Sequence, residues 1–361
     1  MTASRATASL ATRSGKFLVA GHPYAGYTKM ISDAFAKIGY TAECLEYTVP
    51  QSNAFDIALS KASSARKSER NKRMTEACAR AIEERVLEAS PDYVLVIDGN
   101  ELTDKTISYC SSHGTTLVMW AYDSVRNFPW ISRAARNFEF VFTHEPEDLA
   151  AFPPGRTVKY LPLAYDPQTY FPSESPVDHD IDLVFAGAIQ SNYPERTKRL
   201  AMIGRAFPEM TIRVFSPATP LLSPYRLHDL MISISGSDTK VIRGRTGHPE
   251  LNGFYNRAKV CINIHNRQSG LAVSPRSFEI LGSGGLLLTD RAIPMADDLK
   301  AGRDYLLYSD EMDMIEKIRW VMQNKDMATE IARRGHEAAK QGHTYVHRAR
   351  LISDELAKHA P

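Results

Sequence analysis

Short apolar runs alternate with longer amphipathic segments along the first half of the chain. Runs of about four to eight apolar, often β-branched residues between turn-forming residues are typical of buried strands. The predicted strands are Lys16–Ala20, Thr41–Tyr47, Tyr93–Asp98, Thr116–Ala121, Phe138–Thr143 and Val158–Leu161. The predicted helices are Gly26–Ile38, Ala54–Ala89, Thr103–Ser112 and Glu145–Phe152. This alternation predicts a parallel sheet with helices on both faces.

The second half repeats the scheme after a proline-rich stretch, Pro162–Pro176. Its predicted strands are Asp182–Phe185, Thr211–Phe215, Val260–Ile264, Leu286–Thr289 and Tyr305–Tyr308. Two doubly wound α/β domains, residues 16–165 and 166–343, are the simplest architecture. Residues 1–15 lack the apolar core of a secretion signal and are predicted to form a disordered tail, with an organellar transit peptide as the second interpretation.

Composition excludes several classes of protein. Lys plus Arg, 44, nearly balance Asp plus Glu, 42, which argues against a nucleic-acid partner. No apolar run approaches the roughly 18 residues of a membrane span. The four cysteines are scattered without zinc-type or disulfide spacing, so no metal site is expected and the cytoplasm is the predicted location.

One basic run stands out inside the long predicted helix of the first domain. Residues Arg66–Arg73 lie there, while Met74, Cys78 and Ile82 recur at a spacing of four and indicate an apolar stripe. A solvated helix face is the simpler interpretation of the basic run. Peripheral contact with a membrane surface or an anionic acceptor is the alternative.

The segment Cys261–Asp290 carries the densest set of candidate binding residues. A strand and a Gly-containing loop are predicted to precede Ser274 and Pro275, which would be the N-cap and first residue of a helix. The free N–H groups at such a helix start, with Arg276 in the first turn, predict an anion site. Glu279, one turn on, could accept hydrogen bonds from a ribose. A nucleoside diphosphate fits both; an i, i+3 ion pair on a capped helix is the alternative.

A second candidate phosphate site follows the strand Asp182–Phe185. Gly187 allows close approach of the backbone to a ligand, and Arg196 falls in the first turn of the helix that Pro194 would start. A solvated Arg196 is the alternative. Arg243 and Arg245, in a Gly-rich stretch, are further candidates on a mobile loop.

Candidate catalytic residues follow three strands of the first domain. His22, after the first strand, could take a proton from an acceptor hydroxyl. Asp98 and Asp123 also follow strands, and Asp123 lies among aromatic residues suited to stacking on a sugar. For the histidine a turn or capping role, and for both carboxylates a helix N-cap role, is the structural alternative.

Several motifs occur in a fixed order over roughly residues 180–356. They are DLVFAGA at Asp182–Ala188, ELNGFYNRAKVCINI at Glu250–Ile264, the core set Arg276, Phe278-Glu279, Gly284-Gly285 and Leu288-Thr289-Asp290, and GHTYVHRARLI at Gly342–Ile352. In these motifs the chain resembles the CgeB-like (spore maturation protein) glycosyltransferases. Residues before 180 match that family only in general pattern.

The resemblance implies a GT-B enzyme, with two Rossmann-like doubly wound domains facing a cleft. The C-terminal domain would bind a nucleotide-sugar, with Glu279 on the ribose and Arg276 near the diphosphate, and the N-terminal domain the acceptor. Retaining GT-B enzymes commonly carry a second acidic residue eight positions earlier, where this chain has Leu271, so retention and inversion both stay open. The last helix, in 344–361, would pack back on the N-terminal domain.

The expected activity is transfer of a sugar from a nucleoside-diphosphate-sugar donor to a hydroxyl of a saccharide, lipid-linked or protein acceptor, without metal or further cofactor. Asp178, Asp180 and Asp182 imitate the Asp-x-Asp pattern of metal-dependent GT-A enzymes. They lead into a strand, however, and would lie at the sheet edge opposite to the ligand edge. The alternatives are a nucleotide-sugar epimerase of the same fold and a non-catalytic module that binds sugar or nucleotide.

Overall fold

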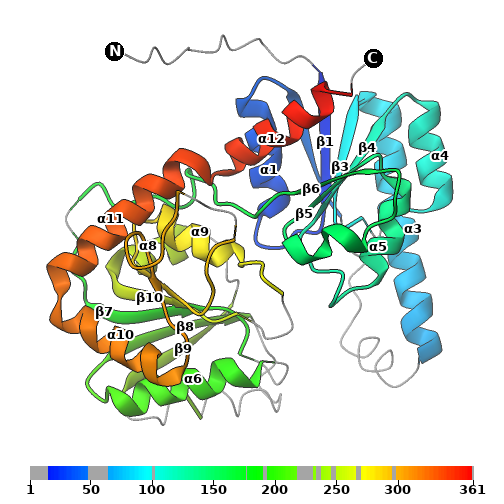
Figure 1. Ribbon diagram of the computed structural model, residues 1–361. Coiled ribbons are helices and arrows are strands. Elements are labelled where there is room, and N and C mark those ends of the chain that lie inside the picture. The colour runs from blue at the N-terminus through cyan, green and yellow to red at the C-terminus, as the bar shows by residue number, and fades with distance from the viewer. Residues whose placement is uncertain are drawn as a thin grey trace, which may run out of the picture.

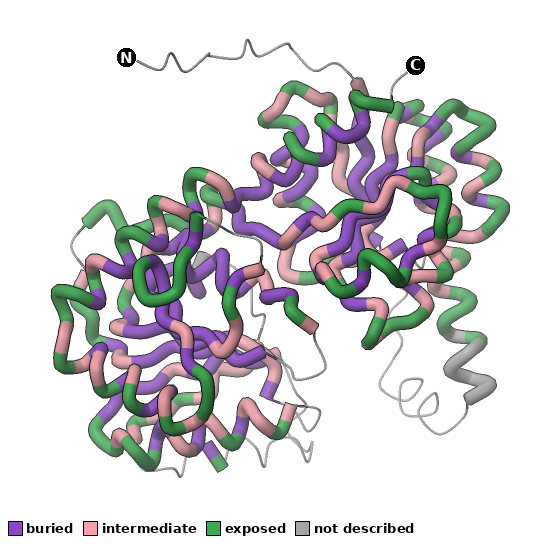
Figure 2. The backbone as a smooth tube through the Cα atoms, viewed as in Figure 1, coloured by how far each residue is buried: buried purple, intermediate pink, exposed green. Residues whose placement is uncertain are grey.

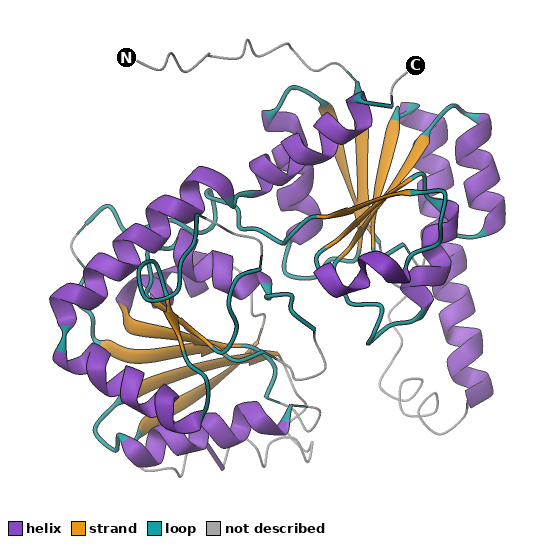
Figure 3. Ribbon diagram, viewed as in Figure 1, coloured by secondary structure: helices purple, strands orange, loops and turns teal. Residues whose placement is uncertain are grey.

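The protein has two α/β domains, each built on one six-stranded parallel sheet with helices on both faces (Figures 1 and 3). The computed structural model describes residues 15–47, 64–99, 102–175, 177–189, 193–217, 231–232, 237–244, 249–265, 270–294 and 298–359. The predicted α/β class with two doubly wound sheets is confirmed.

The sheet of the first domain has the strand order β2-β1-β3-β4-β5-β6. Its strands are β1 (Lys16–Gly21), β2 (Thr41–Glu46), β3 (Tyr93–Ile97), β4 (Thr116–Ala121), β5 (Phe140–Thr143) and β6 (Thr157–Tyr160). Its helices are α1 (Tyr27–Lys37), α3 (Ser64–Ala89), α4 (Asp104–Ser112) and α5 (Trp130–Ala134), with short 3-10 turns η1 (Ala135–Asn137) and η2 (Pro146–Ala151). Helices cover both faces of this sheet because successive residues of β1 place apolar side chains on opposite faces. Phe17 packs in the core cluster on one face and Leu18 in the core cluster on the other.

The sheet of the second domain has the order β12-β11-β10-β7-β8-β9. Its strands are β7 (Ile181–Ala186), β8 (Thr211–Pro217), β9 (Asp238–Gly244), β10 (Ala258–Asn263), β11 (Leu287–Thr289) and β12 (Leu306–Leu307). Its helices are α6 (Pro194–Ala206), α8 (Pro249–Arg257), α9 (Pro275–Gly282), α10 (Glu311–Gln323) and α11 (Lys325–Gly342). A final helix, α12 (Tyr345–Ala357), follows α11.

Two predicted elements differ in the structure. The helix predicted at Glu145–Phe152 is the 3-10 turn η2, because Pro146 and the short loop leave no length for a regular helix. The stretch that contains Arg243 was expected to be a loop, but Arg243 lies in edge strand β9, paired with β8. Charged residues on a half-exposed edge strand hide the apolar alternation. Residues 54–63 of the long predicted helix lie outside the described residues.

The chain passes between the domains at two points that lie side by side. Residues 162–165 lead into the second domain and residues 342–344 lead back, and Tyr165 and Thr344 form a parallel bridge. Helix α12 then lies against α1 of the first domain, where the Tyr40 and Ser353 hydroxyls are 2.7 Å apart (Figure 1). Buried residues continue through this junction, including Leu163, Tyr165 and Tyr345 (Figure 2).

Candidate active site

The strand order of each sheet reverses at one point, and the candidate residues gather there. In the first sheet the switch lies between β1 and β3, followed by His22 and Asp98; in the second it lies between β7 and β10, followed by Gly187 and His265. Ligands of open parallel sheets bind outside the carboxyl ends of the strands at such a switch point. Each domain therefore presents one candidate ligand edge.

These two carboxyl edges face each other. Glu145, which follows β5, accepts hydrogen bonds from the backbone N–H groups of Leu271 and Ala272, both at 3.1 Å. Tyr24, from the loop after β1, lies within electrostatic range of the Arg196 guanidinium of the second domain. Gly270 fits between the domains only without a side chain, since a Cβ there would lie 2.6 Å from a Glu145 carboxylate oxygen. Glu145 thus binds the loop before α9 to the first domain through these hydrogen bonds.

Replacing Glu145 with alanine should remove this hydrogen-bonded contact between the domains and lower the melting temperature. Three charge-assisted hydrogen bonds to a carboxylate of a residue 1% exposed are lost, two from the loop and one from the Glu147 N–H, at a net cost of about 2 kcal/mol or a fall of roughly 2 to 6 °C. Differential scanning calorimetry would measure the shift. Glu147→Ala is the matched control: Glu147 is half-exposed, pairs with Arg126 and lies within electrostatic range of Arg291, but its carboxylate accepts no hydrogen bond from a described residue of the loop. Equal melting temperatures for the two variants would contradict the claim that Glu145 stabilises the contact between the domains.

Arg196 ties together the two loops of the second switch point. Its Nε donates to the Ile264 carbonyl at 2.8 Å and a terminal nitrogen donates to the Ala188 carbonyl at 3.0 Å, while its guanidinium carbon lies 4.6 Å from the centre of the Tyr193 ring. No described Asp or Glu forms an ion pair with it. Burial lowers its pKa from the ordinary arginine value, but the group remains charged at neutral pH. It forms no ion pair with a described carboxylate, although Asp290, which pairs with Arg199 and His265, lies within electrostatic range.

The backbone around Arg196 also favours an anion. Helix α6 begins at Pro194, and its N-cap Tyr193 offers no side-chain cap to the first N–H groups. Gly187 gives room for this arrangement, because a Cβ there would lie 2.9 Å from the Phe185 ring and 3.4 Å from an Arg196 terminal nitrogen. The structure thus brings Gly187 and Arg196 together, as a phosphate site requires.

Beside this cation lies a histidine that the sequence interpretation did not single out. Asp290 accepts a hydrogen bond from His265 Nδ1 at 2.7 Å, and His265 Nε2 accepts one from the Ser274 backbone N–H at 3.1 Å. Because Nε2 accepts a backbone N–H, the ring is neutral in this arrangement and both nitrogens are used; burial lowers the pKa of His265 in the same sense. Its role is to fix the loop before α9. The sequence signal that could have identified His265 is its position directly after a buried strand.

Ser274 is the N-cap residue of α9 and Pro275 its first residue, but the Ser274 side chain caps no backbone N–H. Its hydroxyl instead accepts a hydrogen bond from the Asn263 amide at 3.0 Å. Asn263 also donates to the Ser277 hydroxyl at 2.8 Å. The start of α9 is therefore held by β10 rather than by its own capping side chain.

Arg276 and Glu279 form the i, i+3 ion pair that was the alternative to a nucleotide site. Arg276 donates to one carboxylate oxygen of Glu279, and the Tyr27 hydroxyl of the first domain donates to the other at 2.9 Å. Glu279 is 0% exposed and Arg276 9%. Burial and Glu279 raise the pKa of Tyr27 well above the ordinary value, so the phenol stays protonated as a donor. Contact of this pair with a ribose and a diphosphate stays a prediction.

The candidate bases of the first domain have different surroundings. Asp98 has a left-handed backbone, φ 64°, and its carboxylate accepts hydrogen bonds from the N–H groups of Tyr122 at 2.8 Å and Asp123 at 3.1 Å. Asp98 therefore holds the turn that presents Asp123. Desolvation by the surrounding protein raises the pKa of the Asp123 carboxyl, although its side chain reaches solvent. His22 is half-buried with its ring edge-on to Tyr47 at 5.2 Å. Arg245 lies outside the described residues.

Comparison with known proteins agrees with this architecture. Residues 198–354 match the family model described as glycosyl transferase-like, and no curated protein sequence matches the chain significantly. Sucrose-phosphate synthase from Thermosynechococcus elongatus superimposes with a TM-score of 0.65 at 10% identity, covering 95% of this chain and 98% of that one. HepE from Anabaena in complex with UDP-glucose gives 0.63 at 12% identity, covering 95% and 100%.

A third solved structure, the N-terminal domain of trehalose-6-phosphate phosphatase from Candida albicans, gives a TM-score of 0.64 at 10% identity and covers 96% of this chain and 97% of that one. These likenesses extend over both sheets and over the junction between them. At such low identity they establish the arrangement of the chain rather than its chemistry. The chain therefore has the GT-B fold of glycosyltransferases.

Proposed function

We propose that this protein is a glycosyltransferase that moves a sugar from a nucleoside-diphosphate-sugar donor to an acceptor hydroxyl. The carrying observation is Arg196, a guanidinium that forms no ion pair with a described carboxylate. It lies at the switch point of the second sheet, opposite the candidate bases of the first domain. A diphosphate supplies the charge that this position lacks. The CgeB-like motifs and the glycosyl transferase-like match support the same assignment.

UDP-glucose is the first donor to test, because HepE has been crystallised with it and shares the arrangement of both domains. In the proposed complex the diphosphate lies against the start of α6 and Arg196. The sugar then points toward the first domain, where Asp123 or His22 would take the proton of the acceptor hydroxyl. Hexosyl transfer and the acceptor class, a saccharide, a lipid-linked sugar or a protein, belong to the same proposal. Among the described helices none is long and apolar enough to cross a membrane.

We further propose that transfer needs no divalent metal. Asp180 pairs with Arg257, and Asp182 pairs with Lys259 at 2.5 Å and accepts a hydrogen bond from the Thr211 N–H at 2.8 Å. These carboxylates lie at the amino end of β7, away from Arg196. Charge neutralisation by the Arg196 guanidinium and a helix start works without a metal ion. Product formation in excess EDTA should equal that in magnesium.

Replacing Arg196 with alanine should weaken UDP binding by about 10- to 100-fold, the loss of one charge-assisted contact of about 1.5 to 3 kcal/mol. Isothermal titration calorimetry would measure the dissociation constant, after a thermal-shift panel has identified the preferred nucleoside diphosphate. Arg205→Ala, at an exposed position of the same helix, is the control. Arg196→Lys keeps the charge and should restore part of the affinity.

Each rival function has its own outcome. Unchanged UDP affinity in folded Arg196→Ala protein would overturn the donor assignment. Formation of an isomeric sugar nucleotide without any acceptor would identify an epimerase. Tight donor binding with neither sugar transfer nor donor hydrolysis, over a broad panel of acceptors, would identify a non-catalytic module.

A further inference from the structure

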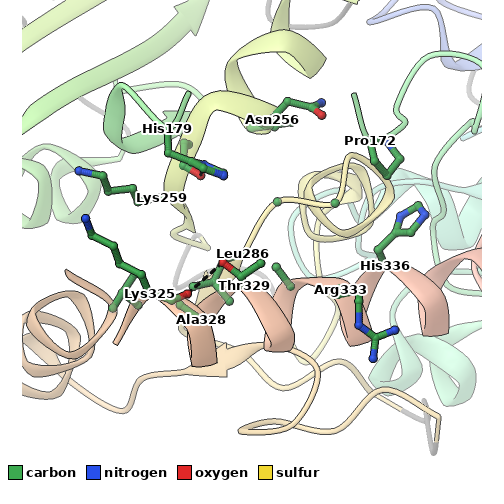
Figure 4. Close-up of a pocket in the computed structure, with 16 residues that line it drawn as sticks. Pro172, His179, Asn256, Lys259, Leu286, Lys325, Ala328, Thr329, Arg333 and His336 are labelled. Carbon is green, nitrogen blue, oxygen red and sulfur yellow. Dashed lines mark hydrogen bonds between the residues drawn. The ribbon is translucent and has the colours of Figure 1, made fainter. Parts of the chain in front are cut away.

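A cavity of about 540 Å³ lies in the C-terminal domain at the amino ends of its strands (Figure 4). Its walls are the residues that precede β7 and β11, the first residues of β10, the end of α8 and one face of α11. Arg196 lies at the opposite, carboxyl edge of the same sheet. The volume falls within the range of small-molecule pockets, so this is a site of ligand size separate from the donor site.

The lining of this cavity combines an apolar wall with basic side chains. The apolar wall includes Ala258, Leu286, Val321, Ala328 and Ala332. The basic side chains come from several elements: His179, Lys259, Lys325, Arg333 and His336. None of the described lining residues is Asp or Glu. A ligand that complements this lining has an apolar body and a negative charge.

The two lysines of the lining lie at one end of the cavity. Figure 4 shows the side chains of Lys259 and Lys325 together at that end, away from Arg333 and His336. Lys259 is paired with Asp182, and Arg333 with Glu330 at 2.8 Å. Lys325 is exposed and forms no ion pair with any described carboxylate. Lys325 is therefore the cation best placed to receive an anionic head group.

The backbone adds to the positive potential there. Lys325 is the first residue of α11, and the side chain of its N-cap, Asn324, caps no N–H of the first turn but donates to the Trp320 carbonyl at 2.8 Å. The positive end of the helix dipole thus lies beside Lys325, with the carboxylate of Asp326 in the same first turn but outside the lining of the cavity. From Lys325 to His336 the cavity face of α11 extends for about 16 Å at 1.5 Å per residue. An apolar chain of medium length can lie along Ala328 and Ala332 within that span.

We propose that this cavity binds an anionic amphiphile, with a carboxylate or phosphate head at Lys325 and Lys259 and an apolar body along α11. The site is independent of the donor site and does not rest on the proposed transferase activity. The cavity is nevertheless close to the buried pair Arg276 and Glu279, because Tyr255 lines the cavity and lies within electrostatic range of both.

Sodium decanoate and decyl phosphate, used below their micellar concentrations, are the probes for isothermal titration calorimetry on the full chain. Decanol and decyltrimethylammonium are the neutral and cationic controls. The two anions should bind at least about tenfold more tightly than either control, since a charge-assisted contact separates them. Preference for decyl phosphate over decanoate would identify the head group as phosphate, and the reverse preference as carboxylate. Equal binding of anionic and cationic chains, or binding of neither anion, would overturn the proposal.

Lys325→Glu is the decisive variant. A glutamate at the first position of a helix is favoured by the dipole, so the protein should fold normally while the head-group charge is reversed. Binding of the preferred anion should weaken about tenfold or more. Lys340→Glu, at an exposed position of the same helix, should change it less than twofold. Equal weakening in both variants, or no weakening in Lys325→Glu, would contradict the site. Arg196→Ala should leave decanoate binding unchanged.

Discussion

Replacing Arg348 with methionine is expected to destabilise the protein by about 3 to 5 kcal/mol. Arg348 is 3% exposed and donates to the carbonyls of Pro162 at 2.7 Å, Gly342 at 2.9 Å and Leu163 at 3.2 Å. It also donates to His343 Nδ1 at 3.0 Å. These acceptors belong to both passages of the chain between the domains. Methionine fills similar space but leaves the buried carbonyls without a donor.

Urea unfolding followed by circular dichroism would measure this loss as a lower midpoint. Arg350→Met, two residues further along the same helix and exposed, is the control and should stay within about 0.5 kcal/mol of the wild type. Arg348→Lys should fall between them, because lysine keeps the charge but lacks the planar set of donors. Burial lowers the pKa of Arg348 to about 10, so the group is charged at neutral pH. An unchanged midpoint for Arg348→Met would show that water replaces its hydrogen bonds.

Replacing Asp123 with asparagine is expected to lower kcat by about 100-fold or more if Asp123 is the base of the proposed transfer. The base must be ionised to accept a proton. Because desolvation raises the pKa of this carboxyl above its ordinary value, wild-type activity should fall as the pH drops, and at a higher pH than for an ordinary aspartate. Steady-state kinetics over pH 4 to 9, on the order of ten points, would show this acid limb.

His22→Ala distinguishes the two candidate bases. Asp104→Asn, at an exposed helix start of the same domain, is the control. Donor affinity should remain at the wild-type value in Asp123→Asn, since Arg196 lies in the other domain. Near-normal turnover in both Asp123→Asn and His22→Ala would place the chemistry elsewhere.

Apolar patterning predicted most of the fold, because strands buried on both faces must be almost wholly apolar. The edge strand β9 was missed, since its Lys and Arg side chains extend along a half-exposed edge. Gly187 and Arg196 were recognised because a turn after a strand and a helix start have local signatures. The sequence around Arg276 and Glu279 is equally compatible with a nucleotide site and with a buried ion pair. Only the tertiary position of Tyr27, 252 residues away from Glu279, shows that the pair is buried.

Arg348 and Glu145 were not recognised for a related reason. Both are charged residues in polar surroundings of the sequence, and such residues are usually exposed. Their burial depends on backbone carbonyls and N–H groups that come from more than 100 residues away, Leu163 for Arg348 and Leu271 for Glu145. A backbone group has no sequence signature, so contacts of this kind are set by topology alone.

Because α12 packs on α1, the first domain cannot complete its packing until α12 has been synthesised. The face of α1 that α12 covers is apolar, and Tyr345, Ala349, Ile352 and Leu356 belong to the same core cluster. At about 5 to 20 residues per second, the ribosome needs roughly 15 to 60 seconds to translate from the end of α1 to the start of α12. During that interval the first domain lacks one of its own walls. The apolar face of α1 should therefore stay uncovered on the nascent chain until α12 has been synthesised.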